Sequence, residues 1–498
     1  MTTELLHRIA ELEKQVEQLE SRNQFLEEQF RLAQQKQFGK RAEGHPGQGE
    51  LFNEAEDLAE APVEEEQETI SYTRNKPKRK PLPEDLPREV IIHDIPDEEK
   101  VCNCCAGTLH CIGEDKSEKL QFIPAQVKVI EHVRPKYACR TCDKDGTNNT
   151  IKQAPVPHSV IPKGYATPSL LSQIITSKYQ YGLPLYRQEA MFKQHGIELS
   201  RKTMADWIIR CSELLKPLYD QLHTLILQQP VIQADETTVK VVDADKATSY
   251  MWLYATGADS PTGKVKDTRV PNIVLFDYHN SRAGRCAVDF LGHYNGYLQV
   301  DGYAAYEQTQ ATLVGCWAHA RRKFMEAKKA QGNKSSGKAD WALNHIQKLY
   351  RIETQINALT VEERHQIRQE KSLPLLNQFQ TWLLKSEQQV LPKTALGEAI
   401  YYCLNQWQKL IRYTLDGQLS IDNNRAERAI KPFVIGRKNW LFSQTARGAN
   451  ASAILYSIIE TAKANDLNVF EYLMDCLDKL SKQQPDIEQL LPWQFANR

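Results

Sequence analysis

A change in the spacing of apolar residues at Pro230 constrains the fold of this 498-residue chain more than any other feature. Beyond it, three runs rich in β-branched and aromatic residues alternate apolar with polar positions, which is the period of strands. A run with helical spacing and one more strand come next. In order, the segments are PVIQADETTVKVV, YMWLYATG, NIVLFDYHN, AGRCAVDFLG and GYLQVDGYAAY. Short connections predict antiparallel pairing of the first three strands, and the helix lets the last strand pair beside the first.

Two carboxylates lie on strands that this order would place side by side. Three antiparallel strands, a helix and a strand beside the first form a ribonuclease-H-like α/β core. Asp235 lies in the first strand and Asp301 at the end of the last, so both carboxylates would emerge at one edge of the sheet. A helix opened by residues 422–427 can bring Glu427 to them. Such carboxylates repel one another unless cations neutralise them, and two Mg²⁺ (or Mn²⁺) ions would do so while catalysing displacement at phosphorus.

Each of these acidic residues also has a purely structural interpretation. Asp235 and Asp301 can be ordinary strand-end or turn residues, because aspartate is common there. Glu427 follows Asn424 by three residues, which is the spacing of a capping box at a helix start. Convergence of the three carboxylates would favour the catalytic interpretation.

Four of the eleven cysteines form two close pairs. Two C-x-x-C pairs can bring four thiolates to a structural Zn²⁺, whereas eleven cysteines are too sparse for a disulfide scaffold in a chain this long. The gap between the pairs is longer than usual, and the alternating run KLQFIPAQVKVIEHVRPKYAC can fill it with strands. Cys104 and Cys111 are additional thiols nearby. The expected zinc ligands are Cys102, Cys105, Cys139 and Cys142.

The first segment carries apolar residues at alternating spacings of four and three. The series is Leu5, Ile9, Leu12, Val16, Leu19, Asn23, Leu26 and Phe30. A β-branched residue at position a with Leu at position d favours a parallel two-stranded coiled coil, and one buried Asn fixes its register. We therefore expect a homodimer or a higher assembly. The alternative is a single amphipathic helix lying on the protein's own core.

Charge is balanced over the whole chain, with 63 basic and 63 acidic residues, but it is locally segregated. Residues 50–68 hold nine acidic residues and no Lys or Arg, and residues 74–80 hold five basic ones. This composition predicts a solvated linker. The sequence has neither a secretory signal core nor an apolar run long enough to span a membrane, so we expect a cytoplasmic protein.

Residues 168–215 return to helical spacing. A helix, a turn at residues 195–196 and a second helix with Ser200 as N-cap match a helix-turn-helix. Arg201 and Lys202 lie in the first turn of the second helix, which is the part that this motif offers to the major groove of DNA. Two helices packed together for purely structural reasons have the same spacing.

Seven motifs in one order carry a resemblance along nearly the whole chain. They are FGKR at 38–41 with LFNEAE at 51–56, the cysteine pairs through RPKYACRTC, QADETTVKV, LQVDGYAAY, GCWAHARRKF at 315–324, DNNRAERAIKPFVIGRKNWLF at 422–442 and YSIIETAKANDLNVFEYL at 456–473. In these motifs the chain resembles the TnpC-type transposases of the insertion sequence sixty-six family. The resemblance implies a DDE catalytic triad of Asp235, Asp301 and Glu427, with Mg²⁺ or Mn²⁺ as cofactor.

Basic residues near the triad are expected to hold DNA phosphates, and a solvated basic face is the alternative. They are Arg321, Arg322, Lys323, Arg425, Arg428, Lys431, Arg437 and Lys438. We expect Trp317 and His319 to pack under the sheet, with no catalytic role for His319.

The expected domains are a coiled-coil segment at 1–43, a linker at 44–89, a zinc module at 90–160, a helix-turn-helix region at 165–228, a catalytic domain at 229–448 with a helical insertion at about 325–420, and a helical region at 449–498. We expect a transposase that cleaves transposon ends and joins them to target DNA. Companion proteins encoded by the same element are a further class of partner. The rival functions are a non-catalytic DNA-binding regulator and a stand-alone nuclease of the same fold.

Overall fold

The computed structural model describes residues 127–137, 152–246, 248–257, 271–331, 337–482 and 485–495, with a few isolated positions before residue 91. The chain divides into two units, Pro62–Ala154 and the remainder. The four expected zinc ligands lie outside the described residues, as do nearly all of the expected coiled coil and linker. Those predictions therefore remain predictions.

The described part of the smaller unit is a short antiparallel pair. Strand β1 (Lys136–Tyr137) pairs with β2 (Lys152–Gln153). Arg134 Nε donates to the carbonyl of Ala154 at 2.9 Å, and Gln153 Nε2 donates back to the carbonyl of Arg134 at 2.9 Å. Of the run in which sequence predicts strands, only residues 127–137 are described, and β1 is the one strand among them.

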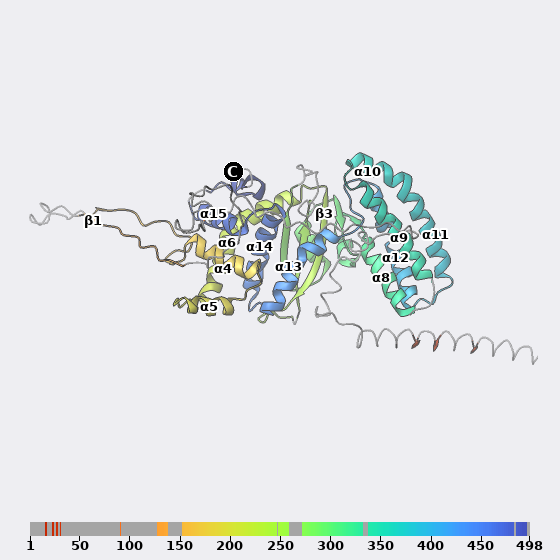
Figure 1. Ribbon diagram of the computed structural model, residues 1–498, viewed down its shortest axis with the longest axis horizontal. Coiled ribbons are helices and arrows are strands. Elements are labelled where there is room, and N and C mark those ends of the chain that lie inside the picture. The colour runs from red at the N-terminus through yellow and green to blue at the C-terminus, as the bar shows by residue number, and fades with distance from the viewer. Residues whose placement is uncertain are drawn as a thin grey trace, which may run out of the picture. The chain divides into compact units, whose positions relative to one another are not determined.

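A five-stranded sheet with the order β5-β4-β3-β6-β7 lies at the centre of the larger unit (Figure 1). The strands are β3 (Val231–Val239), β4 (Ser249–Ala255), β5 (Val274–His279), β6 (Tyr297–Gln299) and β7 (Thr312–Val314). Strands β3, β4 and β5 are antiparallel, whereas β6 runs parallel to β3, and β7 runs parallel to β6. The predicted order of strands and the return of β6 beside β3 are confirmed.

The middle of the sheet is covered by side chains from neighbouring helices. Helix α7 (Gly284–Leu291) lies between β5 and β6 in sequence. The ring of its Phe290 stacks on Tyr254 of β4 with centroids 3.8 Å apart. Almost every residue of β4 is buried, which is expected of a strand covered on both faces.

The outer edge of the sheet is closed by helix α14 (Ala446–Ala464). Ser457 Oγ accepts a hydrogen bond from the N–H of Phe276 at 2.7 Å, and Thr461 Oγ1 accepts one from that of Val274 at 3.0 Å. One helical turn matches two residues of strand in length, so the two hydroxyls reach successive outward-facing groups of β5. The helix thereby satisfies backbone donors that an edge strand would otherwise expose.

The helices before the sheet follow the predicted helix-turn-helix spacing. They are α4 (Pro168–Tyr179), α5 (Leu185–Gln194) and α6 (Arg201–Ile226). Gly196 in the turn has φ +74°, a conformation that glycine adopts without steric cost. Ser200 is the N-cap of α6, as predicted, and accepts from the N–H of Thr203 at 3.1 Å. Helix α15 (Val469–Leu480) packs on α4 and α6, ahead of the short η5 (Glu488–Leu490) and α16 (Pro492–Phe495).

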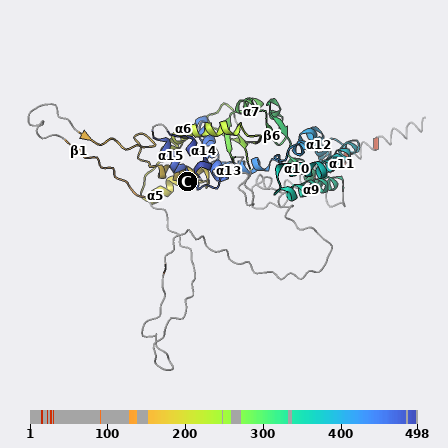
Figure 2. The ribbon, with the colours of Figure 1, turned by 90° about the horizontal axis from the view of Figure 1, so that it is seen from above.

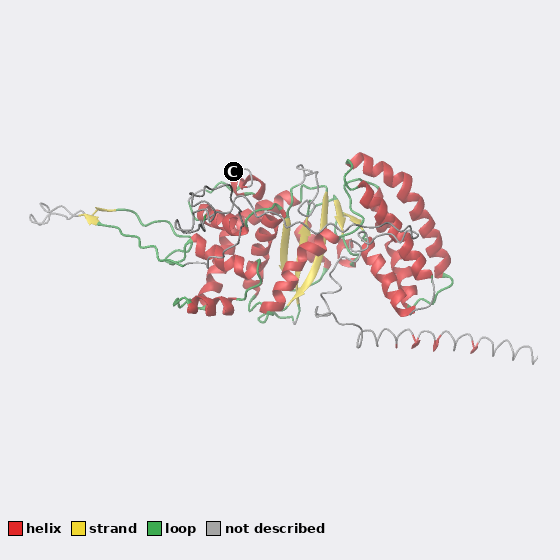
Figure 3. Cartoon of the chain, in the orientation of Figure 1, coloured by secondary structure: helices red, strands yellow, loops and turns green. Residues whose placement is uncertain are grey.

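A second group of helices has its own hydrophobic core. These helices lie to one side of the sheet (Figures 2 and 3). The group comprises α8 (Trp317–Gln331), α9 (Lys338–Ile356), α10 (Val361–Ile367), the π-helical η3 (Arg368–Ser372), α11 (Leu373–Glu387), α12 (Ala395–Ile411) and η4 (Arg412–Thr414). Trp317 lies in this core and donates from Nε1 to the carbonyl of Leu410 at 2.9 Å. Its ring packs against Phe379 and Trp407, and the same core includes Val314 of β7, so this core joins the helices to the sheet.

The chain returns to the sheet as α13 (Asn424–Trp440), which packs on β3 and β4. Among the described residues, none of the helices is long and apolar enough to cross a membrane.

Candidate active site

Asp235 lies in β3, and Asp301 follows the end of β6, the parallel neighbour of β3. Residues 231–233 pair in parallel register with residues 297–299. Two steps farther along the same register are Asp235 and Asp301, and in a parallel pair such residues point to the same face. Each carboxylate is held by a backbone donor: the N–H of Glu236 lies 2.8 Å from Asp235 Oδ1, and that of Tyr303 lies 2.9 Å from Asp301 Oδ1.

The start of α13, the helix that carries Glu427, is fastened to β3 next to Asp235. The side chain of Asn423 donates to the carbonyl of Ala234, the residue before Asp235, at 2.8 Å. The backbone N–H of Asn423 donates to the buried Sγ of Cys316 at 3.2 Å. Glu427 lies one turn farther along, with its N–H bonded to the Asn423 carbonyl at 3.2 Å.

The charge of Asp301 affects the protonation of both Asp235 and Glu427. Burial raises the pKa of Asp235 well above its ordinary value, and the charges of Glu236, Asp301 and Glu427 raise it further. Burial also raises the pKa of Glu427, opposed by the charge of Arg322 and reinforced by that of Asp301. Like charges crowded in a poorly solvated place either take up protons or bind a cation. The cluster is therefore suited to a cation of high charge.

The capping-box interpretation of Glu427 does not fit the helix as it is built. The N-cap of α13 is Asn423 rather than Asn424, and it makes no side-chain capping bond. The side chain of Asn424 donates instead to Asp422 Oδ2 at 2.8 Å. The Glu427 carboxylate faces α8, where Oε1 has no hydrogen-bond partner among the described residues.

His319 and Arg322 of α8 surround the Glu427 carboxylate. His319 Nδ1 lies 3.5 Å from Oε1, and Arg322 Nη2 lies 3.6 Å from Oε2. Arg322 Nη1 lies 3.3 Å from Nε2 of the same imidazole. Since a guanidinium can only donate, Nε2 accepts and the ring proton is on Nδ1, facing Glu427. Burial lowers the pKa of His319 to about 4, so the ring is neutral near pH 7. The expectation that His319 packs under the sheet is wrong.

Two donor sets here could be considered for a metal ion. Cys316, His319 and Glu427 offer ligand atoms within 4.8 Å of one another. However, burial raises the pKa of the Cys316 thiol well above its ordinary value, and Sγ already accepts a backbone N–H. A protonated thiol is a poor ligand. Oxygen ligands suit a hard divalent cation such as Mg²⁺, but among the described residues Asp235, Asp301 and Glu427 do not form a group whose ligand atoms all lie within 4.8 Å of one another.

A second carboxylate on β3 has an arginine partner, and neither residue stood out in the sequence. Glu236 Oε1 accepts from Nε and Nη2 of Arg282 at 3.1 and 2.5 Å. Its Oε2 accepts from the hydroxyl of Tyr306 at 2.7 Å. The guanidinium carbon of Arg282 lies 3.9 Å from the ring centroid of Tyr303. The adjacent Asp-Glu pair was a visible signal for Glu236, but Arg282 comes from a loop 46 residues away.

The basic residues expected to bind DNA are distributed unevenly. Arg201 and Lys202 are exposed at the start of α6. Arg321 and Arg425 are buried, each with 8% of its surface accessible, so in this structure neither presents a charge at the surface. Arg437 is bound to β3, where Nη1 donates to Thr238 Oγ1 at 3.0 Å. The remaining residues are half-buried: Arg322, Lys323, Arg428, Lys431 and Lys438.

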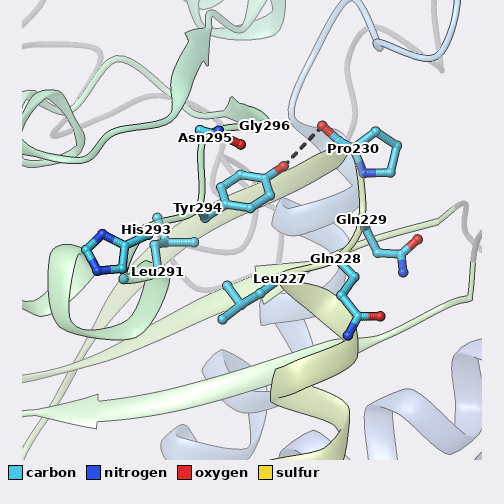
Figure 4. Close-up of a pocket in the computed structure, with 10 residues that line it drawn as sticks. Leu227, Gln228, Gln229, Pro230, Leu291, His293, Tyr294, Asn295 and Gly296 are labelled. Atoms are coloured by element: carbon cyan, nitrogen blue, oxygen red, sulfur yellow. Dashed lines mark hydrogen bonds between the residues drawn. The ribbon is translucent and has the colours of Figure 1, made fainter.

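A shallow pocket of about 450 Å³ lies at the end of the sheet where strands β3 and β6 begin (Figure 4). Pro230 and Gly296 line it, at the beginnings of the two parallel strands whose far ends lead to the aspartates. The Tyr294 hydroxyl donates to the Pro230 carbonyl at 3.1 Å and closes one side. This pocket is thus separate from the carboxylates.

Comparisons with known proteins match most of the chain to domains of transposases. Residues 163–451 match the Transposase IS66 family, and residues 99–143 match the zinc-finger binding domain of transposase IS66. Residues 25–91 match a domain described as Transposase C of IS166 homeodomain, and residues 457–493 match the IS66 C-terminal element. The zinc-finger match includes all four cysteines of the two C-x-x-C pairs.

Relatives in Sinorhizobium fredii (strain NBRC 101917 / NGR234) are similar over most of their length. The uncharacterized protein y4hP is 35% identical over 445 residues, which cover 85% of this chain and 78% of the relative. The uncharacterized protein y4jD is 36% identical over 428 residues, or 83% of this chain and 81% of the relative. No solved structure matches. Because the family match spans residues 163–451, this chain belongs to the IS66 transposase family, with a DDE domain and a zinc-binding domain.

Proposed function

We propose that this transposase cuts and joins DNA with Asp235, Asp301 and Glu427 as the ligands of two divalent cations, Mg²⁺ or Mn²⁺. The observation that carries the proposal is the parallel pairing of β3 with β6, whose register, extended by two residues, aligns Asp235 with Asp301. The bond from Asn423 to Ala234 brings the start of α13 beside Asp235. Chain segments far apart in sequence thereby bring acidic side chains near enough for the charges of Asp301 and Glu427 to act on Asp235. A purely structural role would not require that arrangement.

The catalytic core that we propose is ribonuclease-H-like. The support is the sheet itself: three antiparallel strands, helix α7, and two further strands that continue the sheet in parallel from β3. The helices from α8 to η4 form an insertion between the second aspartate and the helix that carries Glu427.

Two reactions are proposed at this site. In the first, a water oxygen bonds to phosphorus as the bond to the 3′ oxygen breaks; the water gives up a proton and the 3′ oxygen gains one. In the second, the freed 3′-OH attacks a phosphate of target DNA in the same manner, and the 3′ oxygen of the target departs with a proton. Bound divalent cations supply charge stabilisation and a more acidic nucleophile in both reactions.

The protein's own groups prepare this site before DNA arrives. Asp235 and Asp301 are oriented by the backbone N–H groups that they accept. The Glu427 carboxylate is flanked by His319 and Arg322, which restrict its orientation. Preorganised ligands of this kind need little rearrangement during reaction, and this is what makes electrostatic catalysis effective.

DNA binding is proposed to involve the zinc module, the exposed N-terminal turn of α6 with Arg201 and Lys202, and the half-buried basic residues around α13. The coiled-coil segment is proposed to pair two chains so that two DNA ends are held together. Companion proteins encoded by the same element remain further candidate partners.

The test uses the full-length protein and a labelled duplex from the end of the DNA segment that encodes it. We expect cleavage with Mg²⁺ or Mn²⁺, seen on a denaturing gel as a product with a free 3′-OH, and joining of that product to a target plasmid. Binding to the same duplex without cleavage under both cations would support the rival role of a non-catalytic regulator.

A further inference from the structure

Arg282 lies beside the proposed catalytic carboxylates, on the side of Asp301. The hydroxyl of Tyr303 donates to the backbone carbonyl of Arg282 at 2.8 Å, and the N–H of Tyr303 donates to Asp301 Oδ1 at 2.9 Å. One residue thus connects the loop of Arg282 to the turn of Asp301. The guanidinium position is therefore coupled to that of a proposed metal ligand.

The guanidinium of Arg282 is held on two sides. Nε and Nη2 both donate to Glu236 Oε1, and the ring of Tyr303 covers one face of the group. Tyr306 occupies the other oxygen of Glu236 and so fixes the carboxylate that orients the arginine. An arginine held in this way loses little conformational entropy when it binds a further group.

The exposure of this ion pair is strongly asymmetric. The side chain of Glu236 is 2% exposed, whereas that of Arg282 is 44% exposed. Its Nη1 makes no hydrogen bond within the described part of the chain. The pair therefore leaves one donor edge of the arginine available to solvent.

Arg368 shows how a purely structural arginine looks in the same molecule. Its side chain is 1% exposed. Nε and Nη2 bind both oxygens of Glu353, and the remaining donors reach three backbone carbonyls, those of Tyr413, Asp416 and Leu419. Every face of that guanidinium is used internally. Arg282 differs in both respects, since it is open to solvent and has an unused edge.

We propose that Arg282 binds a backbone phosphate of the DNA strand, next to the phosphate that reacts at the carboxylates. A guanidinium can bind Glu236 through one edge and phosphate oxygens through another. Glu236 then acts as a positioning residue that aims the arginine and offsets its charge when DNA is absent. This inference rests on the proposed function, because it takes the substrate of the neighbouring site to be DNA.

The test measures binding and cleavage of a set of duplexes, each with one phosphate near the cleavage point replaced by an uncharged methylphosphonate. The variants are Arg282→Ala and Arg282→Lys, of which the second keeps a positive charge for buried Glu236 and guards against misfolding. Arg285→Ala is the matched control, because that side chain is 86% exposed, lies three residues away and faces Asp289 on its own helix. Binding is measured by fluorescence anisotropy with Ca²⁺, so that it does not depend on cleavage.

We expect one methylphosphonate position to weaken binding of the wild-type protein about tenfold, the effect of losing a charge-assisted hydrogen bond. At that position the replacement should have no further effect on either Arg282 variant, while Arg285→Ala should respond as the wild type does. If the losses of binding free energy caused by the Arg282 variant and by the methylphosphonate simply add at every position, the proposal is overturned. If wild type binds but does not cleave, the proposed function fails, while the binding data still decide the role of Arg282.

Discussion

The imidazole of His319 faces the carboxylate of Glu427, with Nδ1 lying 3.5 Å from Oε1. Neither atom has a hydrogen-bond partner among the described residues, and both are buried. Arg322 donates to Nε2, the other ring nitrogen, so the ring proton is on Nδ1 and faces Glu427. We therefore expect His319 to act as a positioning residue that limits the directions in which the Glu427 carboxylate can turn.

Replacing His319 should weaken metal binding more than DNA binding. His319→Ala removes the donor that faces Glu427, and we expect the affinity for Mn²⁺ to fall about tenfold or more, as is typical when a partner of a ligand is lost. His319→Asn places an amide donor close to the position of Nδ1 and should recover most of that affinity. Calorimetric titration with Mn²⁺ in the absence of DNA measures the affinity of both His319 variants. The binding event that is lost in Glu427→Gln is the one that belongs to the carboxylate site. The exposed His293 supplies the control variant His293→Ala, and equal Mn²⁺ affinity in the two alanine variants would contradict the positioning role.

Arg368 should be among the residues on which the stability of the helical insertion depends most. Arg368→Met would leave the carboxylate of Glu353 and three carbonyls without their partner. Breaking a buried ion pair in this way costs about 3 kcal/mol or more. Urea unfolding measures the loss, and Arg351→Met on the exposed face of α9 is the control. A loss no larger than that of the control would mean that water replaces the missing donors.

The two C-x-x-C pairs should hold about one Zn²⁺ per chain. Cys139→Ser removes one of four expected ligands and should abolish stoichiometric zinc, whereas Cys111→Ser, outside the pairs, should leave it unchanged. Elemental analysis of protein purified without chelator decides the matter. Full zinc content in Cys139→Ser would show that a different set of ligands binds the metal.

The stability of β5 should depend on pH through His279. The hydrogen bond from His279 Nε2 to Asp277 Oδ2, 2.7 Å long, raises the pKa of the imidazole. Because the pKa of His279 is higher in the folded protein than in the unfolded chain, its contribution to stability is fully present below the unfolded pKa, about 6.5. That contribution is lost as the pH rises through the folded pKa. His279→Gln should therefore cost stability near about pH 5.5 and very little near about pH 9. The cost should stay within about 1 kcal/mol because the pair is partly exposed, and an equal cost at both values would contradict this account.

The part of the fold that follows local pattern could be predicted from sequence. Alternating residues after Pro230 predicted the strands, and their connections predicted β6 beside β3. Ser200 was recognisable as an N-cap because a cap is defined by its neighbours in sequence. The parallel pairing of β3 with β6, which leads toward Asp235 and Asp301, followed from the same local pattern.

Contacts between distant segments could not be predicted in this way. Asn423 bonds to Ala234, 189 residues away, and this contact decides where α13 begins. His319 resembled a core histidine because its partner Glu427 lies beyond the helical insertion. Arg282 is a lone arginine in a loop, and the contacts that hold it come from Glu236 in β3 and Tyr303 beyond the end of β6. Each of these residues acquires its chemistry from tertiary contacts.

Glu427→Gln tests most directly whether the three carboxylates form a catalytic site. The substitution keeps the size of the side chain and removes one of the negative charges that would hold the cations. Glu460→Gln is the control, because Glu460 is a buried glutamate that bonds to Lys463 on its own helix α14.

The measurement is the rate of cleavage of end DNA with Mg²⁺, alongside binding of the same DNA. We predict that Glu427→Gln lowers the rate by several orders of magnitude while DNA binding is retained or tightened, because repulsion of the phosphate is relieved. Combining it with Asp301→Asn should add little, since the residues act as one unit. A rate within about tenfold of wild type in the single variant, as expected for Glu460→Gln, would contradict the account and return Glu427 to a structural role.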